Sequence, residues 1–187
     1  GGAMAELERP FGNNKGSWVA SFRRSLLELT FHEGGSQVVP KYTDALVRVE
    51  RSIGDRHVFK FLGIGANDSV AVDTVDGGTD RITGSEWVGM AGVRLDSSWS
   101  DRIASTVVAS VGTSQIDARS RNSNDVVNGL DRGRDVDLQF RGEVRRRSGW
   151  LGDVLAGVAV KAFTFDYELL AYGVWSPYSP SHEDIRA

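Results

Sequence analysis

Hydrophobic and polar residues alternate along the stretch from Asp135 to Phe165, in two successive runs. In the first run, the charged parity comprises Asp135, Asp137, Gln139, Arg141, Glu143 and Arg145, and the apolar parity comprises Val136, Leu138, Phe140, Gly142 and Val144. Because side chains on a strand alternate between faces, this run predicts a strand with one charged and one apolar face. After a turn at 147–149, Val154, Ala156, Val158, Val160 and Ala162 resume the apolar parity. The stretch therefore predicts a hairpin of two long strands.

Similar segments, separated by turn residues, fill the rest of the chain, and helical periodicity is hard to find. The other predicted strands are 3–9, 17–30, 41–53, 57–75, 86–98 and 102–118. The pattern predicts an all-β fold, an antiparallel up-and-down meander of about eight long strands of the outer-membrane β-barrel type, complete or partial. We expect residues 1–173 to form this barrel segment and residues 174–187 to form a loop or tail.

The predicted connections alternate in length. Short turns fall near 12–16, 54–55, 98–101 and 147–149, whereas long polar loops fall near 31–40, 73–84 and 119–131. Bacterial outer-membrane barrels have short turns at one end and long loops at the other. Trp18, Trp99 and Trp150 all lie beside predicted short turns, where an interfacial aromatic girdle would lie; ordinary core aromatics are the alternative.

Composition excludes some classes of protein and leaves others open. The 187 residues include 22 Lys and Arg against 25 Asp and Glu, for a net charge of -3, which does not favour nucleic-acid binding. The chain has no cysteine, so it has neither a disulfide framework nor a cysteine metal site. No run of 18 apolar residues occurs, which excludes a transmembrane helix, but barrel strands of about 9–11 residues read as half polar.

Candidate chemistry is sparse. His32, His57 and His182 lie far apart, no Gly-x-Ser-x-Gly elbow occurs, and the sequence predicts no enzyme, catalytic residue or cofactor. It predicts no metal site from histidines, although the acidic segment 73–80 is a candidate calcium loop, with a solvated loop as the alternative. Arg145–Arg147 could meet lipid phosphates or water at a turn. No residue set identifies a ligand site.

Several short phrases resemble the barrels of TonB-dependent outer-membrane receptors. They are 16–25 (GSWVASFRRS), 39–44 (VPKYTD), 54–57 (GDRH), the strand end 63–68, and 130–140 with the hairpin that follows. The resemblance covers nearly the whole chain.

This resemblance implies a barrel of about 22 strands around an N-terminal plug, which takes up a nutrient or metal chelate with energy delivered through TonB. The expected partners are outer-membrane lipid, an unidentified small-molecule ligand, and, in the full-length parent, the plug and TonB. The chain departs from the family pattern because it has no plug, no TonB-box-like segment and only about eight predicted strands. We therefore expect a segment of such a barrel, in the outer membrane.

A soluble antiparallel barrel or sandwich that binds a small ligand is the alternative. Alternation reports that a strand has two different faces, but it does not report which face meets water. Strand length and the sorting of loops favour the membrane. Leu155 and Phe163 lie on the charged parity of the last strand and do not fit a purely polar lumen.

Overall fold

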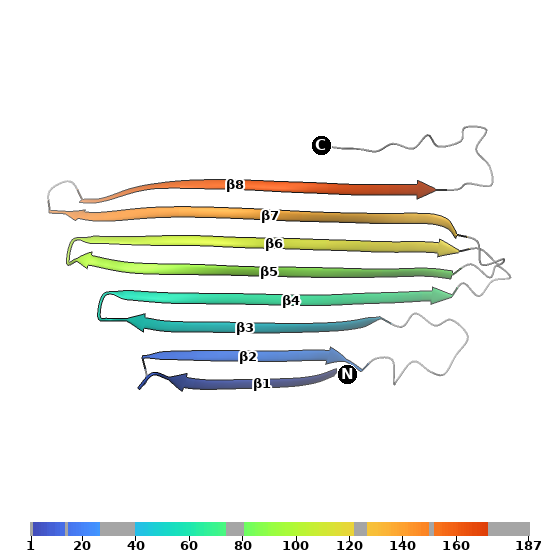
Figure 1. The fold of residues 1–187 in the computed structure, drawn as a ribbon, viewed down its shortest axis with the longest axis horizontal. Coiled ribbons are helices and arrows are strands. Elements are labelled where there is room, and N and C mark those ends of the chain that lie inside the picture. The colour runs from blue at the N-terminus through green and yellow to red at the C-terminus, as the bar shows by residue number, and fades with distance from the viewer. Residues whose placement is uncertain are drawn as a thin grey trace.

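The computed structural model describes residues 2–13, 15–26, 40–73, 81–121, 127–149 and 152–171. These residues form the strands β1 (Gly2–Phe11), β2 (Gly16–Ser25), β3 (Lys41–Ile53), β4 (His57–Asp73), β5 (Arg81–Ser100), β6 (Ile103–Arg121), β7 (Val127–Ser148) and β8 (Gly152–Ala171). All neighbours pair antiparallel in chain order in one eight-stranded sheet (Figure 1), so the predicted all-β up-and-down meander is confirmed. No helix long and apolar enough to cross a membrane is found in the described ranges.

The strands are long, and their connections are sorted by end. Strands β5 to β8 each run for 19 to 22 residues, whereas about 5–6 is usual in soluble sheets. The turns after β1, β3, β5 and β7 join strand ends only a few residues apart, and all four lie at one end of the sheet (Figure 1). The connections after β2, β4 and β6 lie at the other end and are longer. The predicted sorting is therefore confirmed, and we call these the turn end and the loop end.

Several predicted strand boundaries at the loop end were wrong. The prediction for β3 matches the structure, but β2 ends at Ser25 instead of residue 30. The polar segment 119–131 was predicted as a loop, yet β6 continues to Arg121 and β7 begins at Val127. Likewise, β5 begins at Arg81, inside the predicted loop 73–84. At these ends the parity that is apolar elsewhere on the strand becomes polar, as at Arg81 and Thr83 on β5 and Arg119 and Arg121 on β6, so the alternation that reveals a strand in sequence is lost.

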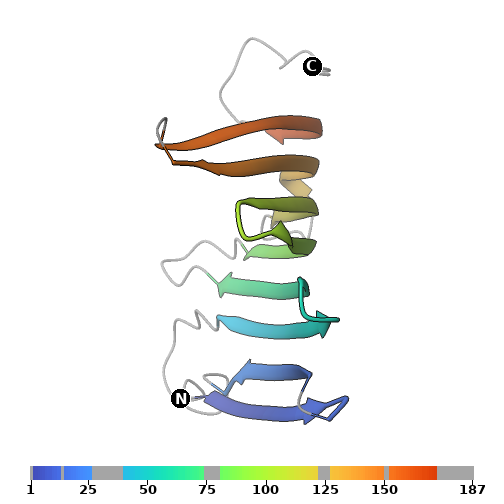
Figure 2. The same ribbon diagram turned by 90° about the vertical axis from the view of Figure 1, so that its left-hand side faces the viewer.

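The sheet is a single layer with two free edges. Figure 2 shows the strands stacked edge to edge, with β1 and β8 at opposite edges. Among the described residues, no hydrophobic side chain is buried. The sheet therefore has no core of its own, and both of its faces need an environment that suits them.

Candidate functional site

One face of the sheet is apolar across all eight strands. The register places one residue from each strand in a row, and the central row is Leu7, Ala20, Val47, Gly63, Ala91, Val111, Leu138 and Ala162. Its neighbouring row toward the turn end runs from Trp18 through Val49, Phe61 and Val93 to Val160. We call this the apolar face. The residues predicted to form the apolar side of the two hairpin strands, β7 and β8, all lie on this face.

Nothing within the described chain covers the apolar face. Leu7 is 63% exposed, Val158 57% and Val160 59%, and every strand except β4 has large apolar side chains on this face that are more than a third exposed. Soluble monomers rarely expose contiguous apolar patches larger than a few hundred Å². A face this wide therefore requires an apolar partner.

The apolar face is a band of limited height. On β5 it runs from Leu95 to Trp87, with Ser97 on one side and Ser85 on the other. The eight steps from Trp87 to Leu95 span roughly 26 Å at about 3.3 Å per residue. Beyond Trp87 the same face of β5 carries Thr83 and then Arg81. β5 thus continues beyond the band for six residues at the loop end (81–86) and for five at the turn end (96–100), and at the loop end the band's own face becomes polar.

The band crosses the strands obliquely. On β8 its apolar run is centred on Val158, which lies in the register row of Leu95. On β1 the run is centred on Ala5, which lies in the row of Gly89. Leu95 and Gly89 are six residues apart on β5, so the band shifts by roughly 20 Å while it crosses about 34 Å of sheet. A level apolar layer would therefore meet these strands at a tilt of roughly 30°, close to the 35–45° of outer-membrane barrels.

Aromatic residues lie at both rims of the band. Trp18 lies near the turn end of β2, opposite Val49. Trp99 lies at the turn end of β5, 57% exposed, and its Nε1 donates a hydrogen bond to Ser105 Oγ at 2.8 Å. Trp87 lies at the loop-end rim. The sequence did not lead us to assign Trp87 to the aromatic girdle, although it has the same parity as Ala91 and Val93. Trp150, the third predicted girdle residue, lies outside the described residues.

The opposite face carries ion pairs, and we call it the charged face. Lys60 Nζ lies 3.8 Å from carboxylate oxygens of both Glu50 and Asp96, which joins β3, β4 and β5. Arg94 Nε donates to Asp96 at 2.9 Å. The pairs Arg23–Asp44, Arg48–Glu50, Arg141–Glu143 and Lys161–Asp137 extend the pattern over β2 to β8. These side chains remain 28–60% exposed, so the face suits water or a polar partner.

The charged face is not polar throughout. Leu155 and Phe163 of β8 lie on it and are 56% and 73% exposed. Toward the loop end, a depression of about 810 Å³ has Leu46 and Ile64 on its floor, with the Arg23–Asp44 pair beside them. The prediction that Leu155 and Phe163 interrupt a purely polar lumen face is consistent with these positions.

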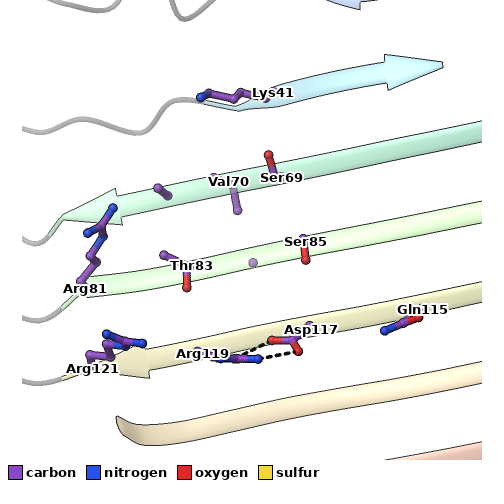
Figure 3. A pocket seen from close by; sticks show the side chains of 12 residues that line it. Lys41, Ser69, Val70, Arg81, Thr83, Ser85, Gln115, Asp117, Arg119 and Arg121 are labelled. Atoms are coloured by element: carbon purple, nitrogen blue, oxygen red, sulfur yellow. Dashed lines mark hydrogen bonds and ion pairs between the residues drawn. The ribbon is translucent and has the colours of Figure 1, made fainter. Parts of the chain in front are cut away.

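A second groove lies on the apolar-face side at the loop end, beyond Trp87 (Figure 3). It measures about 700 Å³ and has a basic lining that includes Arg81, Arg119 and Arg121 from the ends of β5 and β6. Arg119 Nε and Nη2 donate to the carboxylate of Asp117 at 2.8 and 3.1 Å, and Arg132 Nε donates to it at 3.3 Å. The bond from Arg119 lowers the pKa of Asp117, which lies beyond the band, below its usual value. We call this the loop-end groove.

The structure places some of the other residues that the sequence singled out. His57 Nδ1 lies 2.9 Å from Ser97 Oγ, and the His57 ring meets Trp99 edge to face at 5.4 Å between centroids. His32, His182 and the calcium candidate 74–80 lie outside the described residues. In the described part of the chain, no three acidic, His or Cys side chains cluster around a possible metal position.

The glycines of β4 lie where the register brings them onto the apolar face. A Cβ at Gly63 would meet the ring of Phe61 at 3.3 Å, and a Cβ at Gly89 on β5 would meet Trp87 at 2.6 Å. Aromatic rings therefore lean over neighbouring glycines and fill the space that a side chain would occupy. The segment Gly63-Ile-Gly65 belongs to the continuous strand β4.

The chain matches no known protein family, no curated protein and no solved structure. Its class is therefore argued from the sheet itself: an open, antiparallel, single-layer meander with one apolar and one charged face.

Proposed function

We propose that the chain is a segment of an outer-membrane β-barrel, with the apolar face against lipid hydrocarbon and the charged face toward a wet interior. The observation that carries the proposal is the uncovered apolar band, which crosses the strands obliquely. Along a strand it measures roughly 26 Å, and a tilt of roughly 30° reduces this to a height of about 23 Å. The apolar band of outer-membrane barrels is about 25 Å tall.

Three further features support lipid over a second protein layer as the partner of this face. Trp18 and Trp87 lie at opposite rims of the band, as aromatic girdles do. The four short turns lie at one end and the longer connections at the other. On β7 and β8 the strands also continue farther beyond the band at the loop end than at the turn end, as barrel strands do where they rise above the outer surface.

The free edges support a larger barrel. In hydrocarbon, unpaired backbone groups at a sheet edge cost several kcal/mol each, so membrane sheets close. β1 and β8 pair with one neighbour each among the described strands. A closed barrel of only about eight strands fills its interior with side chains, whereas the charged face here carries ion pairs that stay half exposed. Further strands would pair both edges and leave a lumen wide enough for water or a plug.

The finer proposal is that the parent barrel is a TonB-dependent receptor in the outer membrane. It rests on the resemblance of phrases such as 16–25 and 39–44, because no family match accompanies it. The charged face would then meet the plug, the loop end would face the medium, and TonB would energise uptake of a nutrient or metal chelate. The function is transport, without an enzymatic step.

Behaviour in water and detergent tests the barrel proposal. The purified 187-residue chain should associate or precipitate in plain buffer and should fold to β-structure in dodecyl maltoside, with heat-modifiable mobility. A folded monomer in plain buffer would contradict the proposal and would favour the soluble barrel or sandwich.

The receptor proposal needs a separate test in the host cell. Deleting the gene should abolish energy-dependent uptake of one nutrient chelate, and dissipating the proton gradient should abolish the same uptake in the intact strain. If a screen of iron chelates, vitamins and sugars finds no uptake that depends on the gene, the receptor assignment is wrong even if the barrel assignment stands.

A further inference from the structure

The apolar face becomes basic directly beyond the band at the loop end. On that side of the band, the side chains that the structure describes on this face include the cations Arg24, Lys41, Arg81, Arg119, Arg121, Arg132 and Arg134 and the acids Asp117, Asp166 and Glu168. Among these described side chains, seven cations against three acids give the area a positive charge, although the whole chain is negative at -3. We call it the loop-end basic belt; it contains the loop-end groove.

From this position we propose that the loop-end basic belt binds the phosphate groups of an outer-leaflet lipid, specifically a phosphorylated glycolipid. The inference rests on the proposed function, because only a membrane-embedded apolar band brings lipid headgroups to this level. Lys and Arg at a membrane surface attract anionic headgroups at about 1 kcal/mol each. Arginine also donates paired hydrogen bonds to phosphate oxygens.

The heights of the cations favour a large headgroup. Arg24 and Arg134 occupy the first position beyond the band on their strands, and Lys41 and Arg132 occupy the second. Two residues advance roughly 6 Å in height on a strand tilted by about 30°, so these positions lie roughly 6 and 11 Å above the rim. A phospholipid headgroup layer is only about 5–8 Å thick on each side. The first position therefore matches a simple phosphate, whereas the second lies above it.

The remaining cations lie higher still. Arg81 occupies the third position beyond the band on β5, roughly 17 Å above the rim. A lipid that meets all of these heights needs anionic groups spread over a tall polar headgroup, which a phosphorylated sugar provides. The groove also contains the hydroxyl groups of Ser69, Thr83 and Ser85, which can hydrogen-bond to sugar.

The side chains of the groove are held in place but keep donors to offer. Arg119 uses two of its N–H groups on Asp117, and its side chain remains 41% exposed. Arg132 bridges Asp117 and Glu168 and remains 45% exposed. Because a guanidinium has five N–H donors, both arginines can bind a phosphate without losing their partners. The acids thus orient the arginines, and the excess of cations sets the preference for an anion.

Lipid retention by the full chain in dodecyl maltoside tests the proposal, with bisphosphorylated diglucosamine lipid as the probe and native mass spectrometry as the readout. The probe should bind at least tenfold more tightly than the same lipid without its phosphates. Arg119→Gln combined with Arg132→Gln should weaken binding at least tenfold, and the Lys pair at the same positions should restore much of it. The matched control is Arg48→Gln combined with Arg141→Gln. This pair of substitutions also removes two arginines from ion pairs with carboxylates, but on the charged face, so it should leave binding unchanged.

Equal binding of the two lipids, or unchanged binding in the Arg119/Arg132 double variant, would overturn the inference. Full competition by inorganic phosphate at millimolar concentration would overturn it as well, because the site would then serve a free anion. If the chain folds in detergent with heat-modifiable mobility and any of these results appears, the basic belt is wrong and the barrel proposal stands. If the chain is a folded monomer in plain buffer, both fall together.

Discussion

Replacing Val158 by arginine tests which medium meets the apolar face. Val158 lies at the centre of the band on β8, 57% exposed and opposite Gly142. Because no neighbouring side chain covers it, the substitution causes little steric conflict and mainly places a charge in the surrounding medium. An arginine on the lipid face at the bilayer midplane costs about 2–4 kcal/mol, and near the interface about 0–1 kcal/mol. We therefore expect Val158→Arg to destabilise the folded chain by about 2–4 kcal/mol.

Three companion variants on β8 turn this value into a depth profile. Val154 lies at the turn-end limit of the apolar run, and Thr164 is the first residue beyond its loop-end limit at Ala162, so arginine at either position should cost only about 0–1 kcal/mol. Phe163 is the charged-face control: it lies beside Ala162 at the loop-end rim of the band but on the charged face, opposite Asp137 and 73% exposed. Phe163→Arg should change stability by less than about 1 kcal/mol, because an exposed ion pair contributes little.

The measurement is urea unfolding of the full chain from dilauroyl phosphatidylcholine vesicles, followed by tryptophan fluorescence. A cost that peaks at Val158 and falls toward both ends supports hydrocarbon against this face. A flat profile, in which Val154→Arg costs as much as Val158→Arg, would refute the reasoning. So would an equal cost for Phe163→Arg, because it would remove the difference between the faces.

Two further predictions concern single positions on the sheet and use the same unfolding assay. Gly157→Ala should cost about 1–3 kcal/mol, because the new Cβ would lie 2.7 Å from the carbonyl oxygen of Gly142. Gly65→Ala is the control: a Cβ there has nothing within 4 Å, so stability should change by less than about 1 kcal/mol. Equal effects of the two substitutions would contradict the prediction. Glu143→Gln removes the partner of the half-exposed Arg141 and should cost less than about 1 kcal/mol, whereas a loss above 3 kcal/mol would indicate a dry, tightly paired interior.

The sequence predicts the strands well wherever the two faces differ. Strand 41–53 was predicted with its observed bounds because Ala45, Val47 and Val49 alternate with charged residues. At the loop end, Arg119 on one face and Ser120 on the other are both polar, so β6 reads as loop there. Alternation reports that a strand has two different faces, and it disappears beyond the band at the loop end, where the residues on the side of the apolar face are polar.

The candidate sites depend on register, which the sequence alone does not provide. Trp87 and Arg134 are separated by 47 positions in sequence yet lie in one row across β5, β6 and β7. The oblique course of the band follows from comparing Val158 with Ala5 through the whole sheet, and the basic belt follows from the same rows. Single strands give the polarity of a face, whereas the pairing of all eight gives its tilt and height.

Spin labelling along β8 tests most directly whether the apolar face lies in hydrocarbon and the charged face in water. The chain contains no cysteine, so single cysteines at Val158, Ala159, Val160 and Lys161 can each carry one nitroxide. In phosphatidylcholine vesicles, labels at Val158 and Val160 should collide with oxygen and be shielded from a water-soluble nickel chelate, whereas labels at Ala159 and Lys161 should show the reverse. Labels at Val158 and Val160 that are shielded from both reagents, as in a dry protein core, would contradict the account.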